Sequence, residues 1–313
     1  MGLRFRGDDG NNDGEPIRRI WSDMTETSAR PAAAIYRGMD RAALDAAYNN
    51  SAAVADSEDW LARWRDLSTA VRASPRARLD IPYGSRPRAR FDYFPAGAAR
   101  APLFVFIHGG YWQRNDKDMF AFLAEGPRAH GIDIAVVGYT LAPDVRLTDI
   151  VGEIRQALSV LRERADEFGF DRDRLFVGGW SAGGHLTAIV SGHPAFRGGL
   201  PISGIFDLEP IALNYLNEKL ALDASEIATL SPLRVLGDRS PPLRLFVGSD
   251  ELPELRRQSA SYAQAARERG LPVALTVLPA RHHYSILDEL ARPDGAITRA
   301  LVELIEESAR NRG

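Results

Sequence analysis

Short apolar runs and amphipathic stretches alternate along most of the chain. The runs at residues 103–107, 132–137 and 243–247 are continuously apolar, which is typical of strands buried on both faces of a parallel sheet. Strands that alternate with helices imply right-handed βαβ units, so the pattern predicts an α/β fold with a mostly parallel central sheet flanked by helices. Further strands are predicted at 77–81, 89–94, 175–177, 200–205 and 273–278, and helices at 119–130, 147–168, 254–269 and 294–308.

Two helical stretches fall outside this alternation. In the first, Trp60 and Trp64 belong to an apolar face that continues to Val71. This face suits either a lid that lines a substrate pocket or a helix docked on the core, and we slightly favour the docked helix. The second stretch, within residues 207–231, is helical and interrupted. The two stretches predict a small helical cap, from about 36–74 and 207–231, on a single domain that spans residues 24–313.

Composition narrows the classes of function. The 313 residues carry a formal net charge of −3, too small to indicate a nucleic-acid partner or an anionic membrane surface. The chain has no cysteine, which excludes disulfides, thiolate zinc sites and a cysteine nucleophile, and suits a cytoplasmic protein. No run approaches the roughly 18 apolar residues of a membrane span. Residues 1–23 lack a signal-peptide core, are partly rich in Gly, Asp and Asn, and are expected to be a disordered leader.

A strand-to-helix turn at residues 179–183 is the strongest chemical signal. Its sequence, GWSAG, follows the apolar run 175–177, and an apolar pattern at helical spacing resumes after Gly184. Strand, sharp turn and helix form the context of a G-x-S-x-G nucleophile elbow, which would expose Ser181. The competing interpretation is a glycine-rich loop with an unreactive serine, and the flanking pattern makes it the weaker one.

A serine nucleophile needs a histidine base oriented by a carboxylate. In this architecture the chain order is serine, acid, histidine, so only His282 and His283 come late enough. A metal site at this adjacent pair is disfavoured because no third ligand is obvious nearby. The acid should follow the strand 243–247, where Asp250 and Glu251 are both suitable. The pattern alone does not separate the two carboxylates, or the two histidines.

The segment His108-Gly109-Gly110 follows another buried strand. Glycines let the backbone approach a substrate closely, and an oxyanion needs backbone N–H donors. We therefore expect Gly109, Gly110 and Ala182, the residue after the serine, to form an oxyanion hole. A tight turn is the alternative for His-Gly-Gly alone. Tyr111 and Trp112 are candidates for the pocket wall, with ordinary packing nearly as plausible.

Taken together, the motifs resemble a known group. The pair HGG and GxSxG is similar to the hormone-sensitive-lipase-like side of the α/β-hydrolase superfamily. Within it, the chain from about Tyr36 to the end resembles the arylformamidase, or kynurenine formamidase, branch. The segments that carry this resemblance are 108–112 (HGGYW), 138–143 (GYTLAP), 181–186 (SAGGHL), 203–208 (SGIFDL) and 253–259 (PELRRQS).

The resemblance implies residue roles that elimination leaves open. In the family, the catalytic acid precedes a Ser-Pro-Glu-Phe-like segment, which matches residues 253–255 here and so selects Glu251. The catalytic histidine of the family precedes an aromatic residue, which selects His283, followed by Tyr284. Two features depart from better-known eukaryotic members: the acid is Glu rather than Asp, and Trp180 stands beside the serine.

These observations predict a serine hydrolase that needs no cofactor or metal and forms an acyl-enzyme. The substrate would be a small acyl ester or an N-formyl aryl amide, and Tyr111, Trp112, Phe206 and Tyr215 would suit a flat ring. The alternative is a catalytically inactive small-molecule binding protein of the same fold. No nucleic acid or membrane is expected as a partner, and a homodimer is compatible with the sequence.

Overall fold

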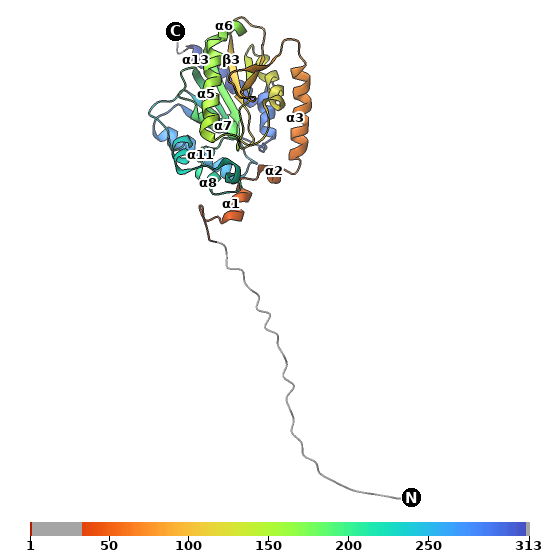
Figure 1. Ribbon diagram of the computed structural model, residues 1–313, viewed down its shortest axis with the longest axis vertical. Coiled ribbons are helices and arrows are strands. Elements are labelled where there is room, and N and C mark those ends of the chain that lie inside the picture. The colour runs from red at the N-terminus through yellow and green to blue at the C-terminus, as the bar shows by residue number, and fades with distance from the viewer. Residues whose placement is uncertain (2–32, 311–313) are drawn as a thin grey trace. The chain divides into compact units, whose positions relative to one another are not determined.

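An eight-stranded sheet forms the centre of the computed structural model, which describes residues 1 and 33–310 (Figure 1). The strand order is β1-β2-β4-β3-β5-β6-β7-β8, and the sheet is parallel from β4 to β8, whereas β2 runs antiparallel to both neighbours. The predicted α/β fold, a mostly parallel central sheet flanked by helices, is confirmed. The strands are β1 Arg78–Pro82, β2 Arg90–Phe94, β3 Ala101–Ile107, β4 Asp133–Val137, β5 Phe170–Trp180, β6 Phe196–Ile202, β7 Leu243–Gly248 and β8 Val273–Leu278.

Helices cover both faces of this sheet, and α5 and α7 lie in front of it in Figure 1. The helices before β4 are α1 Arg41–Ala47, α2 Asn50–Ala53, α3 Ser57–Arg72, the 3-10 helix η1 Lys117–Ala124 and α4 Glu125–Arg128. Those from β4 to β7 are α5 Leu147–Glu163, α6 Ala165–Phe168, α7 Ala182–Ile189, α8 Glu209–Ala212, α9 Asn217–Leu220 and α10 Ala224–Leu230. The remainder are α11 Pro253–Glu268, the 3-10 helix η2 Ser285–Leu287, α12 Asp288–Ala291 and α13 Ala296–Arg310.

The alternation of side chains along the strands explains this layering. In β3, Leu103 and Val105 join the core under α5, α7 and α11, whereas Phe104 and Phe106 join the core under α3, η1 and α13. Successive residues of a strand point to opposite faces, so a continuously apolar strand is buried by helices on both sides.

All eight predicted strands occur, with small differences at their ends. Two helices differ from the prediction. The stretch 147–168 breaks at Arg164 into α5 and α6, and the region predicted at 119–130 consists of the 3-10 helix η1, which begins at Lys117, and the short helix α4. Apolar residues three apart lie on one face of either helix type, so their spacing does not show where a helix is 3-10. The predicted leader lies outside the described residues, apart from Met1.

The two predicted cap stretches are helical and touch each other. The backbone N–H of Tyr215 donates to Oδ1 of Asp45, a residue of α1, at 2.8 Å, and Gln113 Nε2 donates to the carbonyl of Leu216 at 2.7 Å. These bonds join the N-terminal helices, the loop after β3 and the insertion after β6. The exact extent of a cap stays a prediction.

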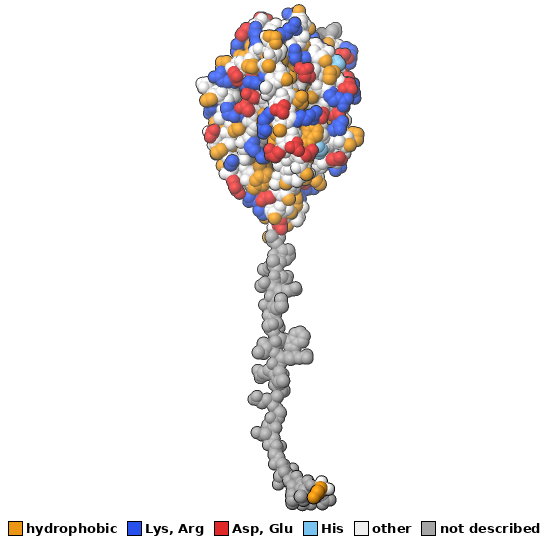
Figure 2. All heavy atoms as spheres, turned by 90° about the vertical axis from the view of Figure 1, so that its right-hand side faces the viewer, with side chains coloured by type: hydrophobic (Ala, Val, Ile, Leu, Met, Phe, Trp, Pro, Cys, Tyr) orange, Lys and Arg blue, Asp and Glu red, His pale blue; other side chains and the backbone are white. Residues whose placement is uncertain are grey.

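No described helix is long and apolar enough to cross a membrane. On the face that Figure 2 shows, basic and acidic side chains are interspersed. This mixture agrees with the small net charge of the whole chain.

Candidate active site

Ser181 stands at the sharp turn between β5 and α7. Its backbone has φ 58° and ψ −116°, a conformation that is strained for a residue with a side chain. The N–H of Ser181 donates to the carbonyl of Ile202 in β6 at 2.8 Å, which ties the turn to the sheet. The helix that follows passes very close to β3, because a Cβ added at Gly183 would lie 1.9 Å from the carbonyl oxygen of Ile107. The local sequence therefore folds as the predicted elbow.

The loop after β3 lies against this serine. A Cβ added at Gly109 would lie 3.0 Å from Cβ of Ser181, so glycine is required for the approach. The carbonyl of Gly109 contacts Asn115 Nδ2 at 3.2 Å and His108 Nδ1 at 2.9 Å. In a trans peptide the following N–H points the opposite way, so these contacts fix the direction of the Gly110 N–H. Ala182 opens α7, where backbone N–H groups have no acceptor within the helix.

His283 and Glu251 form a buried pair behind the serine. His283 Nδ1 and Glu251 Oε2 are 2.7 Å apart, and both side chains are almost fully buried. The second carboxylate oxygen, Oε1, accepts from Ser203 Oγ at 2.5 Å and from the Gly248 N–H at 2.8 Å. These contacts leave the carboxylate one orientation toward the imidazole. Since Nδ1–H donates to Glu251, the Nε2 lone pair is free to accept a proton.

The geometry separates the alternatives that the sequence pattern leaves open. Asp250 is exposed and its carboxylate accepts from Ser249 Oγ at 2.7 Å, away from the imidazole. His282 Nδ1 instead accepts from the backbone N–H of Tyr284 at 3.2 Å, and its ring packs edge-on against Trp60. Neither residue lines the cavity that contains Ser181 and His283.

Ser181 and His283 line one cavity of about 210 Å³. The loop after β3, the turn after β5 and the loop after β8 supply its floor, and the N-terminal helices supply much of its wall. The other lining residues are Asn50, Ser51, Glu58, Leu61, Arg65, Gly110, Tyr111, Arg114, Asn115, Trp180 and Tyr284.

Helix α3 serves both roles that its pattern suggests. Glu58, Leu61 and Arg65, spaced three and four residues apart, line the cavity, while Trp64 is fully buried against the core. The helix is thus docked on the core, as slightly favoured from the sequence, and it also lines the cavity. None of the cavity-lining residues comes from the insertion at 207–231.

The cavity wall carries unneutralised charge. Within residues 33–310, Arg65 and Arg114 have no ion-pair partner, and neither has Glu58. The wall thus carries two cations and one anion, besides the Glu251 carboxylate behind His283. An arginine in a cavity wall can attract a substrate that carries a negative group.

The predicted aromatic wall is partly wrong. Tyr111 lines the cavity, and its hydroxyl donates to the carbonyl of Tyr48 at 2.6 Å while accepting from Asn50 Nδ2 at 2.9 Å. Burial raises the pKa of Tyr111 well above its usual value. Of the other three predicted aromatics, two lie in the core, while Tyr215 is half-buried near Tyr111 and Arg114 without lining the cavity.

Trp112, Phe206 and Tyr215 do not line this cavity. Trp112 is buried with its ring edge-on to His185 at 4.9 Å, and Phe206 is stacked on Tyr262 at 4.5 Å. Both rings contribute to the core under α7 and α11. The correction has a simple cause: a large aromatic side chain suits a core as well as a pocket, and the sequence pattern does not tell the two apart.

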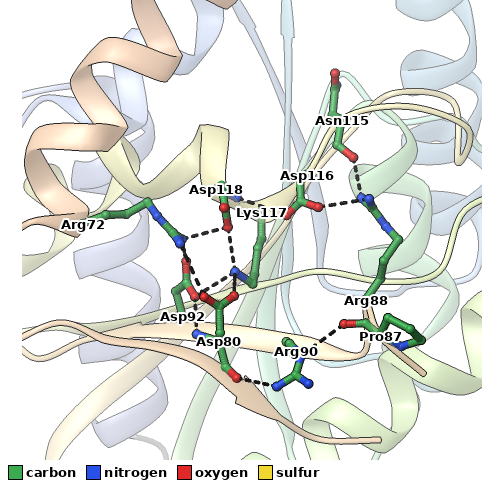
Figure 3. A network of polar contacts seen from close by, with 10 residues as sticks. All are labelled: Arg72, Asp80, Pro87, Arg88, Arg90, Asp92, Asn115, Asp116, Lys117 and Asp118. Atoms are coloured by element: carbon green, nitrogen blue, oxygen red, sulfur yellow. Dashed lines mark hydrogen bonds and ion pairs between the residues drawn. The ribbon is translucent and has the colours of Figure 1, made fainter. Parts of the chain in front are cut away.

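A charged network anchors the loop that follows Gly110 (Figure 3). Lys117 Nζ lies 2.6 Å from Asp80 Oδ1, 2.9 Å from Asp92 Oδ1 and 2.6 Å from Asp118 Oδ1. Arg72, from the end of α3, also pairs with the fully buried Asp92. The three carboxylates are close enough together to hold a metal ion, but the Lys117 ammonium already lies among them. The network links α3, β2 and η1.

Sequence reasoning missed two residues that orient the site. Ser203 lies in a quoted motif, and the adjacency of β6 and β7 could have placed its hydroxyl near Glu251. Asn115 has no comparable signal, because the bond to Gly109 depends on the path of an irregular loop.

Comparison with known proteins shows the family of this chain. The BD-FAE family model matches residues 93–195. The kynurenine formamidase of Danio rerio is 31% identical over 254 residues, covering 76% of this chain and 85% of the relative. This chain belongs to the kynurenine formamidase family. A carboxylic ester hydrolase of Mycobacterium tuberculosis is 30% identical over 263 residues, covering 72% of this chain and 69% of that protein.

Solved structures give the same fold. A thioesterase candidate from Silicibacter sp. tm1040 has a TM-score of 0.75 at 30% identity, covering 83% of this chain and 98% of that one. An esterase from Pyrobaculum calidifontis has a TM-score of 0.67 at 17% identity, covering 80% and 92%, which shows the fold alone. Together these similarities confirm the arylformamidase-like branch of the α/β-hydrolases and support a hydrolase of esters or amides.

Proposed function

We propose that this protein is a serine hydrolase that cleaves small acyl esters or N-formyl aryl amides through an acyl-enzyme. The observation that carries the proposal is the His283–Glu251 pair, held at 2.7 Å, whose imidazole faces the same cavity as the strained Ser181. A serine hydroxyl is a weak nucleophile without such a base.

In the proposed mechanism, Ser181 Oγ attacks the acyl or formyl carbon while His283 Nε2 takes its proton. Glu251 keeps the other ring nitrogen protonated and stabilises the imidazolium that forms. The N–H groups of Gly109, Gly110 and Ala182 stabilise the oxyanion at about 2.7–3.1 Å. His283 then protonates the departing alcohol or amine. Water, activated by the same imidazole, hydrolyses the acyl-enzyme and restores Ser181.

The substrate class is tested by comparing specificity constants for N-formylkynurenine and a series of p-nitrophenyl esters. The kynurenine formamidase relatives favour the formamide, and the carboxylic ester hydrolase relative favours the ester. A kcat/KM at least about tenfold higher for one series would assign the class.

Turnover by Ser181→Ala provides the test of mechanism. The proposal expects the variant to remain folded and to lose nearly all activity toward both series. If the parent protein hydrolyses neither series and is not labelled by a fluorophosphonate, the inactive binding protein is the better account.

A further inference from the structure

Trp180, the residue before the serine, contacts the loop that carries His283 in two ways. Its indole Nε1–H donates to the backbone carbonyl of His283 at 2.8 Å. Its ring also packs on the imidazole, with 4.7 Å between centroids and 36° between planes. The first contact fixes the backbone of the base, and the second limits rotation of its side chain.

The same indole supports the oxyanion loop. A Cβ added at Gly109 would lie 2.6 Å from Cε3 of Trp180, so the Gly109 backbone rests directly on this ring. Trp180 is thus bonded to Ser181 through the backbone, packed on the loop of Gly109 and hydrogen-bonded to His283. Trp180 therefore contacts three of the four segments from which the proposed site is built, all but the loop after β7 that carries Glu251.

Further aromatic rings hold the indole in place. Trp64 of α3 packs edge-on against it at 5.3 Å, and Phe120 and Tyr284 lie at 6.0 and 5.8 Å. Trp180 is only 3% exposed. A large, buried side chain with a satisfied N–H and several ring contacts has little freedom to move, which suits it to orient its neighbours.

We propose that Trp180 is a positioning residue for the catalytic base. It holds the His283 backbone so that Nε2 faces Ser181 while Nδ1 stays on Glu251, and it takes no part in proton transfer. This inference rests on the proposed function. Loss of the indole N–H would leave a buried carbonyl unpaired and let the base loop shift, and misplacement of about 1 Å can lower a rate about 100-fold.

Trp64 offers a matched control for Trp180→Phe. It belongs to the same ring cluster and is fully buried, yet within the described residues its indole nitrogen has no hydrogen-bond partner. Trp64→Phe therefore removes the same atoms without removing a bond to the base loop.

The first test compares steady-state kinetics of the two variants. Trp180→Phe should lower kcat by about 10- to 100-fold with KM changed less than about threefold, while Trp64→Phe keeps kcat within about threefold. Equal losses in both variants would overturn the proposal, because they would reflect packing alone. A loss in KM alone at Trp180 would also overturn it, since that pattern indicates only a pocket wall.

A second replacement isolates the hydrogen bond. Site-specific incorporation of 3-(3-benzothienyl)alanine at position 180 keeps the ring shape and removes the N–H. The proposal expects a lowered kcat with thermal stability close to that of the parent. Full activity of this protein would show that the N–H does not position the base.

A spectroscopic measurement separates this inference from the proposed function. The proton shared by His283 Nδ1 and Glu251 should give a low-field NMR resonance in the parent and in Trp64→Phe, broadened or lost in Trp180→Phe. An unchanged resonance in Trp180→Phe would overturn the positioning role. If the resonance responds as expected but Ser181→Ala retains turnover, the positioning role stands and the proposed serine mechanism fails.

Discussion

The proposed catalytic centre and the wall of its cavity are built on different principles. Ser181, Glu251 and His283 follow the carboxyl ends of β5, β7 and β8, so the order of parallel strands brings them to one edge of the sheet. The wall comes largely from α2 and α3, which have no register with the sheet. The difference teaches that the strand order alone accounts for where the proposed catalytic residues lie. The shape of the cavity, and with it the choice of substrate, depends instead on how separate helices pack.

The largest effect should come from removing the nucleophile. Ser181→Ala is expected to lower kcat by roughly 10⁴-fold or more, because the remaining backbone donors and binding contacts give only residual catalysis. The unfolding free energy should change by less than about 1 kcal/mol. Steady-state kinetics check the loss of kcat, and denaturant unfolding checks the free energy of unfolding. Activity within tenfold of the parent would contradict the assignment of Ser181 as the nucleophile.

The next effect concerns the acid. In Glu251→Gln, the amide oxygen should stay with Ser203 and the Gly248 N–H, which turns the NH₂ group toward His283. The imidazole would then have to accept at Nδ1 and carry its proton on Nε2, the wrong tautomer for a base. We expect kcat to fall by about 10³- to 10⁴-fold.

Asp250→Asn is the matched control for this change. The Asp250 side chain is exposed and faces away from the imidazole, so kcat should stay within about twofold. A larger loss for Asp250→Asn than for Glu251→Gln would reverse the assignment of the acid.

A third prediction compares a buried and a half-exposed member of the charged network around Lys117. Lys117→Met removes a buried cation that faces the fully buried Asp92, and it should destabilise the fold by about 3 kcal/mol. Asp118→Asn changes a half-exposed partner of the same lysine and should cost less than about 1 kcal/mol. Denaturant midpoints measure both, and similar losses would show that burial does not govern this network.

The fourth prediction is a pH dependence of stability. Burial lowers the pKa of His108 and of His185 to about 4, from the ordinary 6.5. Between pH 6.5 and 4, the unfolded chain therefore binds protons at these histidines that the folded protein does not bind. Their contribution to the free energy of unfolding is complete above pH 6.5 and falls as the pH drops toward 4.

His185→Gln should remove its share of that dependence. The slope of unfolding free energy between pH 6.5 and 4 should be shallower than in the parent by as much as about 1.4 kcal/mol per pH unit. Chemical denaturation across this range gives the slope. Identical slopes would mean that His185 is not buried in its neutral form.

The smallest effect is expected at the cavity wall. Arg114→Gln should reduce kcat/KM about two- to fivefold for esters with a distal carboxylate, and less for matched neutral esters, because an exposed charge is screened by solvent. Arg155→Gln on α5, outside the cavity, is the control. Equal changes for charged and neutral esters would show that the wall does not select by charge.

Much of the fold was predictable because buried parallel strands have a distinctive apolar signature, and all eight were located. For the candidate catalytic residues, chain order left only His282 and His283 as the base, and resemblance was needed to select His283 and Glu251, the pair that the structure brings to 2.7 Å. Trp112 and Phe206 were misplaced because their size suits a core equally well. The bond from Asn115 to Gly109 was out of reach, since it depends on the path of an irregular loop.

The most direct test of the central claim is the intact mass of the protein after exposure to a fluorophosphonate. We predict a single added phosphonyl group in the parent protein, mapped to Ser181 by peptide analysis, and no addition in Ser181→Ala. Labelling at another residue, or equal labelling of the Ser181→Ala variant, would contradict the account.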